Sequence, residues 1–138
     1  MKLSCALLAL GLAVAPLSAQ EAPDSATLEL GRQFTQWFFA GEDQKLWEKF
    51  GPQMKEAMGA VANLPAFRDQ VATQLGEETA VTDETTMEAQ GYKIYLRTST
   101  YSKMDGPILT QWAIAEDGTI GGFFIRPKPA GKYLVSHN

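Results

Sequence analysis

Cysteine and histidine are almost absent from this chain of 138 residues. Its one cysteine, Cys5, lies near the N-terminus, and its one histidine, His137, is the second-last residue. Catalysis by a thiol, thiolate metal sites and triads with an internal histidine base are therefore excluded. Metal sites built from several imidazoles are excluded as well, so we expect neither a bound metal nor another cofactor.

Long apolar runs are also missing, apart from residues 3–17. This run follows a basic Lys2 and ends at small residues, which is typical of a secretory signal peptide over residues 1–19 with cleavage after Ala19. The run is too short to span a membrane, so we expect no membrane segment after its removal. We therefore expect the protein to be secreted or periplasmic.

Positive charge is scarce in the first part of the mature chain. Residues 20–90 hold 5 basic and 13 acidic side chains, whereas residues 91–138 hold 6 basic and only 3 acidic ones. Those three acids, Asp105, Glu116 and Asp117, all lie at predicted turns. No basic cluster is present, so we expect no nucleic-acid partner. A small anionic ligand bound on the C-terminal part is compatible with this distribution.

Residues 92–126 carry the strongest structural pattern in the chain. They are rich in β-branched and aromatic residues, and Asp-Gly pairs interrupt them at 105–106 and 117–118. Asp-Gly between alternating apolar runs is a strong hairpin signal, so three long antiparallel strands are predicted. Residues 79–90 alternate apolar and polar side chains up to a Gln-Gly turn and predict one further strand. Together they predict a meander of about four strands.

Upstream of the strands, apolar residues recur at helical spacing in several pieces. The first piece ends at Gly41, the second is capped by Asp43, a third begins at Pro52, and the last runs from Pro65 to Gly76. The aromatic stripe on these pieces is typical of core packing. The apolar residues of the first, second and fourth pieces, which we expect in the core, are Leu30, Phe34, Trp37, Phe38, Leu46, Trp47, Phe50, Phe67, Val71 and Leu75, and the third piece carries Met54, Ala57 and Met58.

Helices followed by a strand meander predict an α+β fold. We expect the broken N-terminal helices to pack on one face of a curved antiparallel sheet, as in a cone or cystatin-like roll. The predicted organisation is a signal peptide at 1–19, a leader at 20–27, the α+β domain at 28–129 and a loose tail at 130–138.

Several segments resemble known proteins. FTQWFFAGEDQKLWEKF is similar to the start of the nuclear transport factor 2-like cone fold, which ketosteroid isomerases and polyketide cyclases share. LWEKFGPQMKEAM, FRDQVATQLGEE, GYKIYLRTSTYSK and DGTIGGFFIRP more closely resemble an uncharacterised bacterial domain that is often found ahead of a secreted α/β-hydrolase. The resemblance covers residues 28–129 and implies a cavity-forming fold. Its motifs are packing and turn motifs, so it implies no catalytic residue.

Simple pairing across even-numbered loops predicts a strand register and two sheet faces. Ser99 would pair with Trp112, and Trp112 with Phe123. A three-residue loop or a bulge near Pro107 would exchange the two faces and turn Arg97 toward solvent or a partner. The bulkier face, which we expect beneath the helices, collects Tyr95, Arg97, Ser99, Tyr101, Ile108, Trp112, Ile114, Phe123 and Ile125.

Arg97 is the most informative polar residue on this face, because a buried guanidinium without a partner is strongly destabilising. It requires either a carboxylate of the chain, such as Asp69, Glu48 or a neighbour, or the anionic group of a ligand. Its planar fork of donors suits a carboxylate. The candidate ligand-binding residues are Arg97, Tyr95, Tyr101, Trp112 and Phe123.

Candidate catalytic residues are few. A cone-fold enzyme would use a carboxylate base with a tyrosine or acid as oxyanion donor. Tyr95 and Tyr101 are the candidate donors, and Asp69 is the candidate base, although it falls on a polar helix side that is typical of a solvated charge.

Three functions follow from these residues. The first is an exported, non-catalytic binding or accessory domain that holds a small anionic and apolar ligand in the cone cavity. The second is a small isomerase, dehydratase or cyclase-like enzyme that uses a cavity carboxylate and a tyrosine. The third is a structural domain that forms a homodimer or binds a separate hydrolase.

Overall fold

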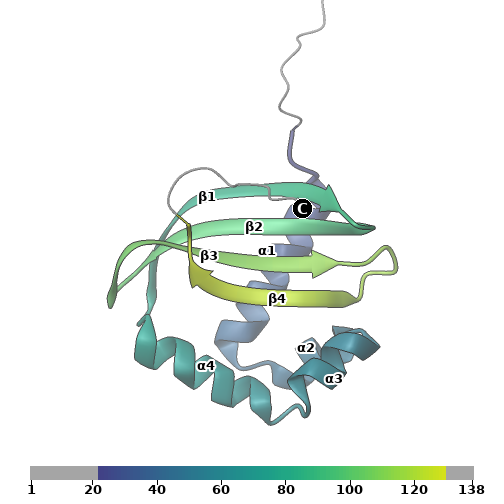
Figure 1. Cartoon of the computed structure of the whole chain (residues 1–138), viewed down its shortest axis with the longest axis horizontal. Helices are drawn as coiled ribbons and strands as arrows, with labels where there is room; N and C mark the ends of the chain where they lie inside the picture. Colours follow the sequence, from purple (N-terminus) through teal and green to yellow (C-terminus); the bar gives the residue numbers. More distant parts are fainter. Residues whose placement is uncertain (1–21, 130–138) are drawn as a thin grey trace, which may run out of the picture.

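The computed structural model describes residues 22–129, in which four helices precede four strands (Figure 1). The helices are α1 (Ser25–Ala40), α2 (Asp43–Lys49), α3 (Pro52–Met58) and α4 (Asn63–Gln74), and the strands are β1 (Glu78–Ala89), β2 (Tyr92–Tyr101), β3 (Met104–Ile114) and β4 (Ile120–Pro127). The predicted α+β class with a four-stranded meander is confirmed. The predicted signal peptide, Cys5, the predicted C-terminal tail and His137 lie outside the described residues.

Helix α1 is fixed at both ends by its own sequence. Asp24 caps the N-terminus, because its carboxylate accepts hydrogen bonds from the Ala26 amide at 3.3 Å and the Thr27 hydroxyl at 2.8 Å. Gly41 ends the helix with φ of +82°, a conformation that side chains with a Cβ rarely adopt. The helix therefore presents Phe34 and Phe38 to the sheet, and both side chains are fully buried.

Helices α2 and α3 lie near the β4 edge of the sheet, where α3 contacts β4, and α4 runs from there to the start of β1 (Figure 1). Pro52 stands at the first turn of α3, where no amide hydrogen is needed. The Gly51 amide donates to the Ile120 carbonyl at 2.9 Å and so ties this region to β4. Helix α4 begins at Asn63, slightly before the predicted Pro65, and Gly76 follows it with φ of +84°.

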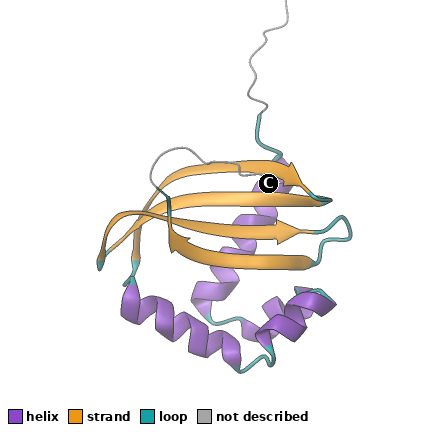
Figure 2. Ribbon diagram, viewed as in Figure 1, coloured by secondary structure: helices purple, strands orange, loops and turns teal. Residues whose placement is uncertain are grey.

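The strands form one antiparallel sheet in the order β1-β2-β3-β4 (Figure 2). The predicted pairing of Trp112 with Phe123 between β3 and β4 is confirmed. The predicted pairing between β2 and β3 is wrong, because Ser99 lies opposite Ile108 and not opposite Trp112. The two-residue connection at Ser102 and Lys103 replaces the expected Asp-Gly turn, and the even shift leaves each side chain on its predicted face.

The core lies between the helices and the inner face of the sheet, which confirms the predicted inner face. Trp112 and Phe123 stack there with ring centroids 3.8 Å apart. Phe34 contacts Trp112, and Phe38 meets Phe123 edge to face, so α1 interlocks with β3 and β4. The buried cluster consists of Phe34, Phe38, Leu46, Phe50, Met54, Leu64, Val71, Leu75, Tyr95, Tyr101, Ile108, Trp112, Ile114, Ile120 and Phe123.

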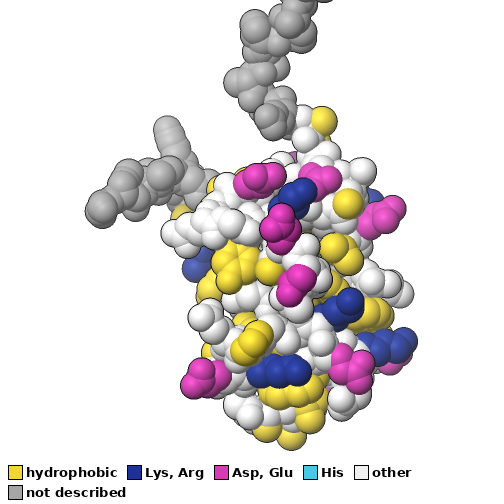
Figure 3. Space-filling model, turned by 90° about the vertical axis from the view of Figure 1, so that its right-hand side faces the viewer, with side chains coloured by type: hydrophobic (Ala, Val, Ile, Leu, Met, Phe, Trp, Pro, Cys, Tyr) yellow, Lys and Arg dark blue, Asp and Glu magenta, His cyan; other side chains and the backbone are white. Residues whose placement is uncertain are grey.

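None of the helices within residues 22–129 is both long and apolar enough to cross a membrane. The side of the molecule that carries the β1–β2 and β3–β4 turns has basic and acidic side chains interspersed over it (Figure 3).

Candidate functional site

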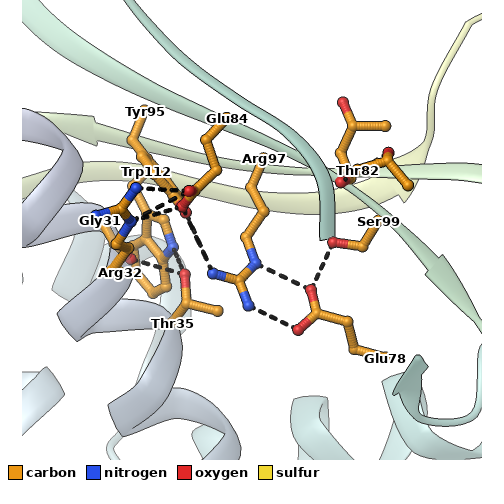
Figure 4. A network of polar contacts seen from close by, with 11 residues as sticks. Gly31, Arg32, Thr35, Glu78, Thr82, Glu84, Tyr95, Arg97, Ser99 and Trp112 are labelled. Atoms are coloured by element: carbon orange, nitrogen blue, oxygen red, sulfur yellow. Dashed lines mark hydrogen bonds and ion pairs between the residues drawn. The ribbon is translucent and has the colours of Figure 1, made fainter. Parts of the chain in front are cut away.

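A cluster of polar side chains interrupts the apolar inner face of the sheet next to β1 (Figure 4). We call it the inner polar cluster, and it consists of Arg32, Glu78, Glu84, Tyr95, Arg97 and Ser99. Arg32 comes from α1, the two glutamates come from edge strand β1, and the other three residues come from β2. With two arginines and two carboxylates, the cluster is balanced in formal charge.

Arg97 binds Glu78 through both arms of its guanidinium. Its Nε donates to Glu78 Oε2 at 2.9 Å, and its Nη2 donates to Oε1 at 2.6 Å. The Ser99 hydroxyl donates to the same carboxylate at 2.5 Å. Both side chains are nearly enclosed, with 14% of Arg97 and 17% of Glu78 exposed. Arg97 therefore has an internal carboxylate partner, which is Glu78 and not Asp69 or Glu48.

Glu84 organises the other half of the cluster. Arg32 donates to its carboxylate from Nε at 2.9 Å and from Nη2 at 2.7 Å, and the Tyr95 hydroxyl also donates to it. Arg97 Nη1 donates to the Tyr95 hydroxyl oxygen at 3.2 Å. Tyr95 thus joins the two ion pairs into one network (Figure 4).

The pKa shifts follow from these contacts. Burial alone would raise the pKa of Glu78, but the hydrogen bonds from Arg97 and Ser99 outweigh burial and lower it. The bond from Arg32 lowers the pKa of Glu84. Burial, with the bond to Glu84 next, raises the pKa of Tyr95 to about 12. At neutral pH both glutamates are therefore ionised and the tyrosine is protonated.

Two buried hydroxyls beside the cluster, those of Tyr101 and Thr110, have no well-formed hydrogen bond among the described residues and contact only each other. The two side chains are 3% and 1% exposed. Tyr101 lies opposite Glu78 in the β1–β2 pairing, and Thr110 lies opposite Arg97 in the β2–β3 pairing. Burial, with the Glu78 carboxylate next, raises the pKa of Tyr101 to about 12.

An open pocket of about 410 Å³ borders the cluster. It lies between the end of α1, the second half of α4 and the start of β1, and we call it the α4 pocket. Arg68 on its wall is already bound to Asp43, with distances of 2.7 and 3.2 Å. Glu78 belongs to both the pocket and the cluster. The lining residues are Phe39, Arg68, Val71, Ala72, Gly76, Glu77 and Glu78.

The predicted site residues divide into three groups. Arg97 and Tyr95 lie in the inner polar cluster, and Tyr101 lies beside it. Trp112 and Phe123 stack on each other in the core, and neither lines the α4 pocket. Asp69 is exposed on α4, so the carboxylates near the two tyrosines are Glu84 and Glu78 instead.

Glu78 and Glu84 are not among the site residues predicted from the sequence. Glu84 lies in the strand predicted over residues 79–90, and Glu78 lies directly before it. Their even spacing puts both side chains on one face of this strand. That spacing was the available signal, since two carboxylates facing the helical layer require cationic partners there. In the part of the chain that is described, no group of three or more His, Cys, Asp or Glu side chains is arranged to hold a metal ion.

Comparison with protein families, curated proteins and solved structures found no match to this chain. The resemblance to the nuclear transport factor 2-like cone fold therefore stays a prediction.

Proposed function

We propose that this chain is an exported, non-catalytic binding domain that holds a small ligand with an apolar body in the α4 pocket. The observation that carries this proposal is the pocket itself, which has apolar walls from Phe39, Val71 and Ala72 and polar groups from Arg68, Glu77 and Glu78. Its volume of about 410 Å³ falls within the range of roughly 300–1,000 Å³ that is usual for small-molecule sites. The predicted signal peptide supports an exported location.

The protonation states in the cluster support binding over catalysis. A general base works best when its pKa lies near the working pH, but Glu78 and Glu84 both have lowered pKa values. Tyr95, with a pKa of about 12, already donates to Glu84. An isomerase, dehydratase or cyclase-like enzyme would have to use this carboxylate and tyrosine after breaking the contacts that hold them.

A pocket-filling substitution tests the proposal. Ala72 is exposed and lines the pocket, so Ala72→Phe should fill it without disturbing the core. Ala66→Phe is the matched control, because Ala66 is exposed on the same helix and is not part of the lining. We expect small apolar compounds to raise the melting temperature of the wild type and of Ala66→Phe, but not of Ala72→Phe. Equal stabilisation of all three proteins would contradict the proposal.

The outer face of the sheet supports a second candidate, a structural domain that pairs with another copy or with a separate hydrolase. The helices cover only the inner face, and Phe124 on the outer face is 46% exposed. Light scattering should then detect a dimer that Phe124→Lys weakens. A monomer at high concentration, with no partner captured by the immobilised domain, would count against this candidate.

A further inference from the structure

We propose that the fork of Arg97 is a carboxylate site that Glu78 occupies from within the chain, and that an apolar monocarboxylic acid displaces Glu78 from it. This inference rests on the proposed function, because the apolar part of the acid would lie in the α4 pocket. Glu78 is the residue that connects the two places, since its carboxylate binds Arg97 and the residue belongs to the lining of the pocket.

The two partners of this ion pair are held differently by the sheet. Arg97 and Ser99 lie on β2, which is paired with a strand on each side. Glu78 is the first residue of edge strand β1, and the strand register shifts directly after it, between Glu78 and Ala80. Arg97 and Ser99 therefore form the fixed part of the proposed carboxylate site, and Glu78 is the residue that a ligand would displace.

Displacement requires only a side-chain rotation. The backbone before Glu78 is attached to the β2–β3 turn, because the Ser102 amide donates to the Glu77 carbonyl at 2.9 Å and the Glu77 amide donates to the Ser102 hydroxyl at 3.0 Å. The Glu78 side chain is already 17% exposed, and Glu78 is one of the residues that line the pocket. Its carboxylate can therefore turn into solvent at the pocket while the strand stays in place.

The proposed carboxylate site contains hydrogen-bonding groups that do not bond to Glu78. The hydroxyls of Tyr101 and Thr110 lie on the same face as Arg97, are nearly fully buried and contact each other outside normal hydrogen-bond geometry. Buried hydroxyls are normally hydrogen-bonded, so this pair still has capacity to bind a further group. A free carboxylate is not constrained by the backbone of β1, so it can accept from Arg97 and Ser99 and reach toward these hydroxyls as well.

The chemistry of the site selects the ligand class. A guanidinium fork binds a planar carboxylate through two parallel hydrogen bonds. Glu78 competes as an intramolecular group at high effective concentration, so a short acid such as acetate should not displace it. Apolar burial against Phe39, Val71 and Ala72 adds about fourfold in affinity per methylene group. The expected ligand is therefore a monocarboxylic acid with a medium-length alkyl or aryl body.

The first experiment compares sodium octanoate with 1-octanol by calorimetric titration of the wild-type protein. We expect octanoate to bind at least tenfold more tightly, because only the acid can take the place of Glu78 in the Arg97 fork. Both ligands should lose affinity in Ala72→Phe. Equal affinity of acid and alcohol would overturn the inference and leave the proposed function standing, whereas no binding of either would contradict the proposed function itself.

The second experiment removes the Glu78 carboxylate from the site. Glu78→Ala should lower the melting temperature, and sodium acetate should restore it in a saturable way that equal sodium chloride does not reproduce. Asp83→Ala is the control, because Asp83 is an exposed carboxylate on the same strand, outside the cluster. Rescue that is absent, or equal for both variants, would overturn the inference. If Glu78→Ala does not fold, the octanoate comparison in the wild type decides.

Discussion

At the residue scale, the indole of Trp112 is held by one hydroxyl. Its Nε1 donates to Thr35 Oγ1 at 2.9 Å, and that hydroxyl donates in turn to the Gly31 carbonyl at 2.7 Å. Trp112 is fully buried, so its donor has no access to water. Thr35 therefore accepts the hydrogen bond of the largest side chain in the core and fixes the position of α1 over β3.

We predict that Thr35→Val lowers the free energy of unfolding by about 1–3 kcal/mol, because the Trp112 donor would remain buried without an acceptor. Thr35→Ser is the matched control, since it keeps the hydroxyl and should cost less. Urea denaturation followed by tryptophan fluorescence measures both variants. A loss in Thr35→Ser that equals or exceeds the loss in Thr35→Val would contradict a dominant role of the hydrogen bond.

The presence of Arg97 on the inner face could be predicted from the sequence, but its partner could not. Glu84 lies opposite Arg97, and continuing that register would put Glu78 opposite Lys103, beyond the end of β2. Two register shifts in β1 bring Glu78 back to a position opposite Tyr101. Bulges depend on tertiary curvature, so alternation of side chains alone does not locate them.

At the element scale, α1 packs on the sheet through a glycine. A Cβ built on Gly31 would come within 2.1 Å of the Tyr95 ring, and Tyr95 is fully buried. A β-carbon on α1 at this point would therefore require the helix or the ring to move. The close approach sets the depth at which α1 lies against β2 and brings Arg32 within reach of Glu84.

We predict that Gly31→Ala lowers the free energy of unfolding by roughly 1–3 kcal/mol through overpacking. Alanine improves intrinsic helix propensity by about 1 kcal/mol, so the sign of the effect separates packing from propensity. Gln33→Ala, at an exposed position of the same helix, is the control and should be nearly neutral. Thermal unfolding of the two variants measures the difference, and a stabilised Gly31→Ala would contradict this packing.

The hairpins show how far turn chemistry determines register. The Gln90-Gly91 turn was predicted correctly, and both residues have positive φ angles of 54° and 85°. The Asp-Gly pair at 105–106 lies inside β3 instead of at its turn. Pro107 has no amide to close a tight loop there, and the chain after α4 binds the turn at Ser102 through long-range hydrogen bonds. The position of this turn is therefore set by long-range hydrogen bonds and not by the local Asp-Gly motif.

At the scale of the whole molecule, two buried tyrosines make stability sensitive to alkaline pH. The pKa values of Tyr95 and Tyr101 are about 12 in the folded chain and about 10 in an unfolded one. Between these values the unfolded chain loses protons that the folded chain keeps, so rising pH favours unfolding. Their contribution is complete below pH 10 and decreases above it.

We predict that the free energy of unfolding decreases by about 1.4 kcal/mol per pH unit for each of these tyrosines between pH 10 and 12. Tyr101→Phe should reduce the slope by one such contribution. At neutral pH the same variant should be about as stable as the wild type or more so, because the removed hydroxyl contacts only the Thr110 hydroxyl, outside normal hydrogen-bond geometry. Urea titrations across this pH range would contradict the account if the two slopes were identical.

The helices and the sheet together enclose the charges of the inner polar cluster, which a sheet without helices would leave exposed to solvent. Removing one member of a buried ion pair typically costs about 3–5 kcal/mol, because the remaining charge stays buried without a partner. Glu78, one member of this pair, also lines the α4 pocket. The proposed ligand site depends on this shared position of Glu78.

The most direct test is chemical-shift mapping by nuclear magnetic resonance as octanoate is added to the labelled protein. We predict that the affected signals are the amides of Val71, Ala72, Gly76 and Glu78, together with the side-chain Nε–H of Arg97, whose acceptor changes. Perturbations confined to the outer face of the sheet, or an Arg97 signal that does not move while the pocket amides do, would contradict it.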